Sequence, residues 1–195
     1  MSVEAMFYFD LRSPEAYLAA ERALQVLPPP CEWQPILTAK LPSAESFEAY
    51  RCEQERDSIR EGFELRAAAL SLQPLRWPAP FPYDSRFAML AATYAKRIGK
   101  TVAFALAAYR QAFAGGHAMS ERDNVLIAAA ACEIHPAAIL RATQTRSIAA
   151  ELEAASAQAL ALGVSDVPAV RVGERVLIGE RSLEQAGELL EAARR

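Results

Sequence analysis

The first apolar segment of the chain alternates in the manner of a β-strand. Residues 5–11 place Met6, Tyr8 and Asp10 on one side of an extended backbone and larger apolar side chains on the other. The aromatic content of this segment is typical of strands. A second apolar segment at 31–37 predicts another strand.

A helix is expected between these two strands. Ser13 is a natural N-cap, Pro14 suits the first helical position, and Glu15 complements the positive end of a helix. Three consecutive prolines at 28–30 cannot continue a helix and therefore end it. The chain is thus predicted to begin as strand–helix–strand.

The next hundred residues show helical spacing of their apolar positions. The helix starts that we expect are Ser43 or Ser46, Asp84 or Ser85, Thr101, a capping box at 120–123 and Pro136. Beyond them, 145–162 form a further helix, closed by Gly163. A hairpin is expected around Gly173 and Glu174, and Ser182 is expected to cap the last helix.

This order predicts an α/β protein with a thioredoxin-like fold. The thioredoxin-like domain consists of residues 1–40 and 144–195, and an all-helical insertion domain at 41–143 separates the two pieces. In such a fold the reactive cysteine pair stands at the start of the first helix, where this chain has Ser13 and Ala16. Disulfide exchange at that place is therefore excluded.

Composition narrows the classes of partner. The chain has 195 residues, 52% of them hydrophobic and 23% charged, with a net charge of −3. The sequence has no stripe of basic residues, so nucleic acid is not expected as a partner. No apolar run approaches the roughly 20 residues of a membrane helix. Three widely spaced cysteines (Cys31, Cys52 and Cys132) and two histidines predict neither a disulfide framework nor a metal site. With no secretory pattern at its start, we expect a cytoplasmic protein.

Several segments together carry a resemblance to a known family. They are Phe7 to Pro14, Trp33 to Leu37, Phe81-Pro82, Gly115 to Asn124, and Gly163 to Val170 with Gly179. Over nearly its full length the chain resembles the 2-hydroxychromene-2-carboxylate isomerase and kappa-class glutathione transferase branch of the DsbA-like proteins. The resemblance implies a DsbA-like fold with the active site between the two domains.

The resemblance also implies a cofactor and a catalytic residue. Ser13 occupies the position of a catalytic serine that works with the thiol of bound glutathione. Pro168 occupies the position of a cis-proline, and the preceding residues Asp166 and Val167 would pair with the tripeptide backbone. Without the resemblance, the sequence favours the interpretation of Ser13 as a helix cap alone.

Other expected binding residues depart from the family pattern. Arg181 stands where the family has the Asp that binds the glutamyl end of glutathione, and the adjacent Glu180 is a candidate replacement. The segment 38–44 is shortened, with Lys40 in place of a substrate-binding lysine. Arg12, beside Ser13, is expected to contact an anionic substrate.

The predicted function is a glutathione-dependent isomerase of the 2-hydroxychromene-2-carboxylate type, acting on aromatic catabolic intermediates. Its partners would be glutathione and a small-molecule substrate, and a homodimer is one expectation from the family. A kappa-like glutathione transferase uses the same residues and is the first alternative. The second is a non-catalytic thioredoxin-like binding protein that has lost glutathione, as Arg181 and the short 38–44 segment suggest.

Overall fold

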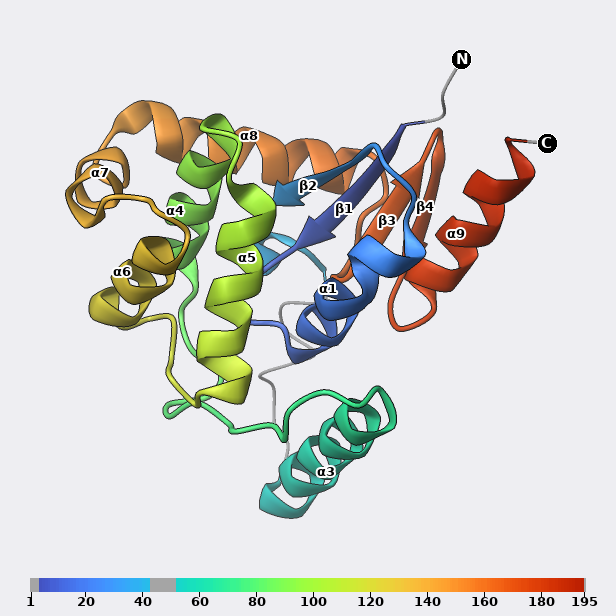
Figure 1. Ribbon diagram of the computed structural model, residues 1–195, viewed down its shortest axis with the longest axis horizontal. Helices are drawn as coiled ribbons and strands as arrows, with labels where there is room; N and C mark the ends of the chain where they lie inside the picture. The colour runs from blue at the N-terminus through green and yellow to red at the C-terminus, as the bar shows by residue number, and fades with distance from the viewer. Residues whose placement is uncertain (1–3, 43–51, 195) are drawn as a thin grey trace.

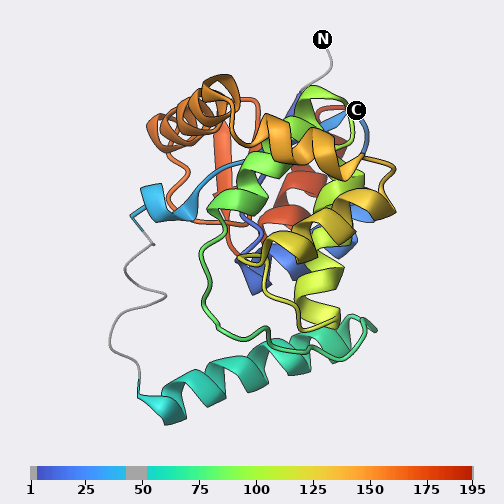
Figure 2. The ribbon, with the colours of Figure 1, turned by 90° about the vertical axis from the view of Figure 1, so that its left-hand side faces the viewer.

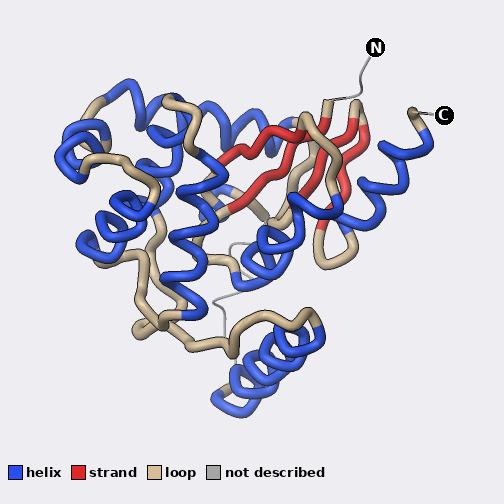
Figure 3. Tube along the Cα trace, in the orientation of Figure 1, coloured by secondary structure: helices blue, strands red, loops and turns tan. Residues whose placement is uncertain are grey.

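A mixed four-stranded sheet forms the centre of the molecule. The computed structural model describes residues 4–42 and 52–194. Its strands are β1 (Ala5–Phe9), β2 (Cys31–Pro35), β3 (Ala169–Val172) and β4 (Arg175–Ile178). They lie in the order β2-β1-β3-β4, with β2 parallel to β1 and the hairpin strands β3 and β4 antiparallel (Figure 3).

Helices cover both faces of this sheet. Helix α1 (Pro14–Val26) connects β1 to β2 and lies beside α9 (Ser182–Ala192) on one face (Figure 1). Helix α8 (Arg146–Ala161) runs along the opposite side (Figure 2). Because the sheet is covered twice, β1 is buried on both sides, and Phe7 pairs in register with Trp33 and Val170. Strand β1 is therefore a rigid support for the loop that follows it.

The segment between β2 and α8 is helical. After the short turn η1 (Thr38–Lys40) it contains α3 (Glu53–Ala69), α4 (Arg86–Arg97), α5 (Thr101–Tyr109), the π-helical turn η2 (Arg110–Ala114), α6 (Arg122–Ala131) and α7 (Pro136–Ala142). Helix α4 packs on β2 and α8, and α5 packs on α1.

Aromatic rings join the inserted helices to the sheet. The ring centroids of Tyr17 and Phe113 lie 5.5 Å apart, and those of Tyr17 and Tyr109 lie 5.9 Å apart. Tyr109 also packs against Phe9 of β1 at 6.2 Å. Through these ring contacts, α1, α5 and β1 share one continuous core. Large buried rings of this kind contribute strongly to core stability.

Helix α3 stands apart from the other helices in both views (Figures 1 and 2). Its buried residues are Phe63 and Ala67, whereas residues 53–58 are all exposed. Leu65 is 66% exposed. Packing thus holds α3 only from Ile59 onward, and the helix contacts α1.

The predicted α/β fold with a helical insertion is confirmed, and two predicted caps are wrong. Arg181, not Ser182, is the N-cap of α9, and Ser182 lies buried in the first turn. Glu121, not Ser120, precedes α6, without a capping side chain. The expected helix starts at Ser43 and Ser46 lie outside the described residues. The division into 1–40, 144–195 and 41–143 stays a prediction.

Candidate functional site

Ser13 lies at the N-terminus of α1, as the sequence predicts. Its Oγ accepts a hydrogen bond from the backbone N–H of Ala16 at 3.1 Å, and its carbonyl oxygen accepts from Tyr17 N at 3.1 Å. A hydroxyl has one proton and two lone pairs, so a capping serine can still donate its proton to a ligand. Ser13 is half-buried, which leaves part of it within reach of a ligand.

The loop between β1 and Ser13 is held by the carboxylate of Asp10. One oxygen, Oδ1, accepts from Arg12 N at 3.1 Å, and Oδ2 accepts from both Thr38 N and Thr38 Oγ1 at 2.8 Å. In the described part of the chain, Asp10 is the one charged side chain that is fully buried. A buried carboxylate is tolerated where donors surround it, as they do here.

The opposite wall of the site is the loop before β3. The Val167–Pro168 peptide bond is cis, as expected. Val167 itself is buried, and its N–H donates to Oδ1 of Asp166 at 2.7 Å. The carbonyl oxygen of Pro168 accepts from Gly179 N at 2.9 Å, which ties this loop to the turn between β4 and α9.

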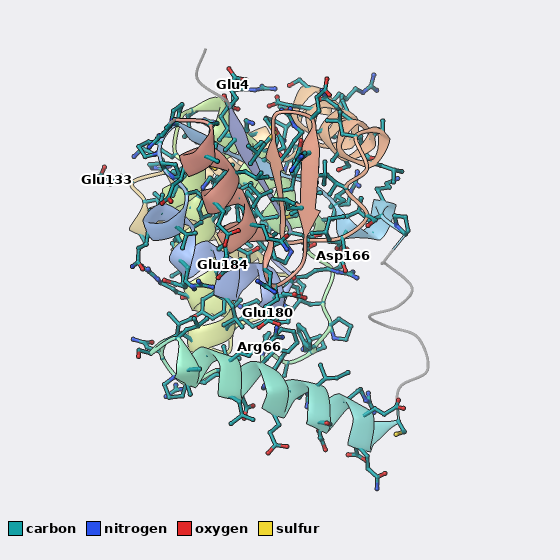
Figure 4. All side chains as sticks on the ribbon, turned by 90° about the vertical axis from the view of Figure 1, so that its right-hand side faces the viewer. Glu4, Arg66, Glu133, Asp166, Glu180 and Glu184 are labelled. Atoms are coloured by element: carbon teal, nitrogen blue, oxygen red, sulfur yellow. The ribbon has the colours of Figure 1, made fainter. Side chains whose placement is uncertain are left out.

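A charged pocket of about 140 Å³ lies between α1, α3 and the β4–α9 turn. The residues that line it are Glu15, Leu18, Ala19, Arg22, Arg66, Ala69, Leu70 and Glu180. Arg66 Nη1 of α3 forms an ion pair with Glu180 Oε2 at 3.0 Å, and Figure 4 shows the two side chains in the space between α3 and the rest of the molecule. The pocket therefore presents both signs of charge to a ligand.

The carboxyl of Glu15 is partly buried in this pocket and is surrounded by charged groups. Burial raises its pKa, the nearby Arg66 guanidinium opposes the rise, and the charges of Asp166 and Glu180 add to it. A hydrogen bond from the Glu180 backbone also favours the ionised form. These interactions show that the start of α1, the loop before Pro168 and the β4–α9 turn converge around Glu15.

The remaining predicted residues, Arg12, Arg181 and Lys40, are not among the residues that line the charged pocket. Arg12 is half-buried, and its charge acts on the phenol of Tyr83. Arg181 is exposed and does not line the charged pocket. Lys40 is ion-paired with Glu153 of α8 at 3.3 Å, and no interaction among the described residues connects it to Ser13.

Sequence reasoning missed two contributors to the site. Glu15 was interpreted only as a complement to the helix end, and Arg66 carried no signal, because its value depends on where α3 lies. The sequence places Asp10 just before Ser13, but it does not show the bonds of Asp10 to Thr38, which join two segments of the chain. Only the spacing of the Asp10-x-Arg12 turn is visible in the sequence.

The thiols of Cys31 and Cys132 are poorly suited to reaction. Burial raises the pKa of Cys31 to about 11, and burial also raises the pKa of Cys132. A raised thiol pKa lowers the fraction of reactive thiolate. The described residues also contain no group of three or more His, Cys, Asp or Glu that could hold a metal ion. No described helix is both long and apolar enough to cross a membrane.

Comparisons with known proteins agree with the observed fold. The profile of the DSBA-like thioredoxin domain matches residues 5–191. A solved 2-hydroxychromene-2-carboxylate isomerase superposes with a TM-score of 0.84 at 18% identity, over 98% of this chain and 96% of that one. A protein assigned as a DsbA oxidoreductase from Streptomyces coelicolor gives 0.79 at 17% identity, over 98% and 89% of the two chains.

A third solved structure is the cytosolic disulfide reductase DsbM from Pseudomonas aeruginosa with GSH. Its TM-score is 0.64 at 14% identity, over 98% of this chain and 97% of that one. None of the curated proteins compared with this chain matches it in sequence. The structural matches therefore establish a shared fold.

Proposed function

This chain belongs to the DsbA-like thioredoxin family, and from that premise we propose that it is a glutathione-dependent isomerase of the 2-hydroxychromene-2-carboxylate type, acting on aromatic catabolic intermediates. The observation that carries the proposal is the Ser13 hydroxyl at the α1 N-terminus, where members with disulfide chemistry need cysteine. The fold of the named isomerase supports it. A cytoplasmic location and a homodimer remain predictions of this proposal.

The start of α1 has the properties that a bound thiolate requires. The N-terminus of a helix has partial positive charge and unpaired N–H groups. Ser13 Oγ accepts from Ala16 and retains its proton, which it can donate to a sulfur anion. When bound, glutathione supplies a thiolate that adds to an unsaturated carbon and later leaves it, so that a bond isomerises without net oxidation.

The residues around Ser13 fit the rest of a glutathione molecule. The charged pocket offers Arg66 to a carboxylate, and Glu15 and Glu180 to an ammonium group, as in an α-amino-acid end. Val167 N–H is held by Asp166, so an extended peptide would replace that carboxylate as acceptor. Arg12 stands beside Ser13 and would orient an anionic substrate.

Two alternatives share parts of this site. A kappa-like glutathione transferase would use the same Ser13 and the same charged pocket, with a different electrophile. A non-catalytic binding protein would retain the fold without the cofactor. Two observations favour this second alternative. Arg181 is exposed, and Lys40 forms its ion pair with Glu153 of α8 and not with a residue near Ser13.

Calorimetry with reduced glutathione tests the proposal. We expect saturable binding to the wild-type protein and binding about tenfold weaker or more in Arg66→Met, since a charge-assisted hydrogen bond contributes about 1.5–3 kcal/mol. Arg60→Met is the matched control, because Arg60 lies on the same helix over the Trp77 ring. Absence of binding to wild type would favour the binding-protein alternative. Turnover of a chloronitroaromatic but not of the chromene would favour the transferase.

A further inference from the structure

The loop that leads into Ser13 is anchored by the inserted helical segment. Leu11 N donates to the sulfur of Met89 in α4 at 3.3 Å. The carbonyl of Leu11 accepts from the hydroxyl of Tyr83 at 2.6 Å, and the carbonyl of Asp10 accepts from the hydroxyl of Tyr109 at 2.9 Å. Residues far along the chain thus bind two consecutive carbonyls of this loop.

The second carbonyl bond acts on the geometry of Ser13 itself. The carbonyl of Asp10 that accepts from Tyr109 also accepts from Ser13 N at 3.0 Å. The side chain of the same Asp10 accepts from Arg12 N. The direction of the Asp10 carbonyl therefore sets where Ser13 begins α1, and the Leu11 carbonyl sets the peptide plane next to it.

We propose that Tyr83 and Tyr109 are positioning residues for Ser13, acting through the Asp10 and Leu11 carbonyls to aim its hydroxyl at the bound thiol. This inference rests on the proposed function. It assigns to the helical segment a task beyond covering the site, because the two phenols come from the connector before α4 and from α5.

Burial makes these two phenols permanent donors. Tyr109 is fully buried and Tyr83 is 4% exposed. Burial, together with the charge of Asp10, raises the pKa of both phenols well above the ordinary value. A phenol that keeps its proton at any working pH gives a fixed hydrogen bond, and a buried bond in a low-dielectric core is directionally strict.

Tyr17 provides a matched control. It is also buried, and its ring lies in the same aromatic cluster as Tyr109. Burial raises the pKa of its phenol to about 12, and the charges that act on that phenol are those of Glu21 and Arg110. Tyr17→Phe therefore removes a buried hydroxyl from the same core without touching the loop carbonyls.

The first experiment measures the pKa of bound glutathione from thiolate absorbance. We expect Ser13→Ala to raise this pKa by about 1 or more, because a bond to a charged group is lost. Tyr83→Phe and Tyr109→Phe should each raise it by about 0.5, as expected when a donor is misaligned rather than removed. The double variant Ser13→Ala/Tyr83→Phe should match Ser13→Ala alone, because Tyr83 acts through Ser13.

The second experiment needs no glutathione. Amide hydrogen exchange at Arg12 and Ser13 should become about tenfold faster in Tyr83→Phe and Tyr109→Phe, but not in Tyr17→Phe. The proposal is overturned if the two variants behave like Tyr17→Phe in exchange. It is also overturned if the double variant exceeds Ser13→Ala in the bound-thiol pKa. A wild-type protein that binds no glutathione would sink the proposed function, while exchange would still decide whether the phenols fix the loop.

Discussion

The loop at 10–13 and helix α3 border the same site but are held in opposite ways. The loop has its carbonyls, amides and buried carboxylate bonded to four separate segments. Helix α3 is held by Phe63 and Ala67 and by the Arg66–Glu180 ion pair, with its first turns exposed. The loop that precedes Ser13 is thus fixed by many buried hydrogen bonds, whereas α3 is held by few contacts.

The largest expected effect comes from removing the acid at the centre of the loop. Asp10→Ala leaves Arg12 N, Thr38 N and Thr38 Oγ1 without their acceptor. Each unsatisfied buried group costs about 1–3 kcal/mol, so we expect a loss of about 3–5 kcal/mol in the free energy of unfolding. Urea denaturation measures this loss.

A matched exposed aspartate provides the control for that prediction. Asp84 makes the same type of bond, to Arg86 N at 2.9 Å, on an exposed turn. Asp84→Ala should cost only about 1 kcal/mol, as for an ordinary helix cap. Equal losses in the two variants would show that the loop is not specially held.

The second prediction compares two phenylalanines. Phe113, in the central aromatic cluster, is fully buried, whereas Phe63 is the main anchor of α3. Phe113→Ala should cost about 3–5 kcal/mol, as in other well-packed cores. Phe63→Ala should cost less and should speed protease cleavage within 53–69, because α3 detaches locally. If global stability falls equally in both, α3 is an integral part of the core.

The third prediction concerns pH. The folded protein raises the pKa of Glu15, so it binds a proton more tightly than the unfolded chain does. The contribution of Glu15 to stability therefore falls as pH rises from about 4.3, the ordinary glutamate value, through the raised value. Glu15→Gln should remove this fall and should be at least as stable as wild type at neutral pH.

Urea denaturation between acidic and neutral pH measures that difference. Glu191→Gln, on an exposed position of α9, controls for the loss of one carboxylate. If Glu15→Gln is less stable than wild type at neutral pH, then the attraction of Arg66 outweighs burial at this site.

The smallest effect is expected at the surface. Glu153 accepts from Arg86 at 2.8 Å and pairs with Lys40 at 3.3 Å, and all three side chains are more than a third exposed. Glu153→Gln should cost less than about 1 kcal/mol, and added salt should reduce the cost further. A large loss would mean that Lys40 fixes the 38–42 segment, and thereby the Thr38 bonds to Asp10.

The local features of the site were predictable from the sequence, but its three-dimensional convergence was not. Ser13 with Pro14 is a local cap pattern, and Gly173-Glu174 is a local turn pattern, and both are confirmed. The hydrogen bond of Tyr83 to Leu11 could not be predicted, because a hydroxyl bonded to a distant carbonyl leaves no periodic signal in the sequence. Arg66 could not be assigned to Glu180 before the position of α3 was known.

One wrong cap shows how a local reading fails. Ser182 has the residue type of an N-cap, but Gly179 adopts a positive φ of 86° and its carbonyl accepts from Ser182 N at 3.0 Å. This turn places the N-cap one residue earlier than predicted, at Arg181, so that Ser182 is the first helical residue and is buried. Because the turn also ties Gly179 to Pro168, tertiary contacts override the local preference.

The most direct test of the account is turnover of 2-hydroxychromene-2-carboxylate, followed by its absorbance, with and without reduced glutathione. We predict turnover by the wild-type protein only when glutathione is present. Ser13→Ala should reduce the rate about a hundredfold, as for loss of one donor to a developing anion, while glutathione still binds. Turnover without glutathione, or an unchanged rate in Ser13→Ala, would contradict the account.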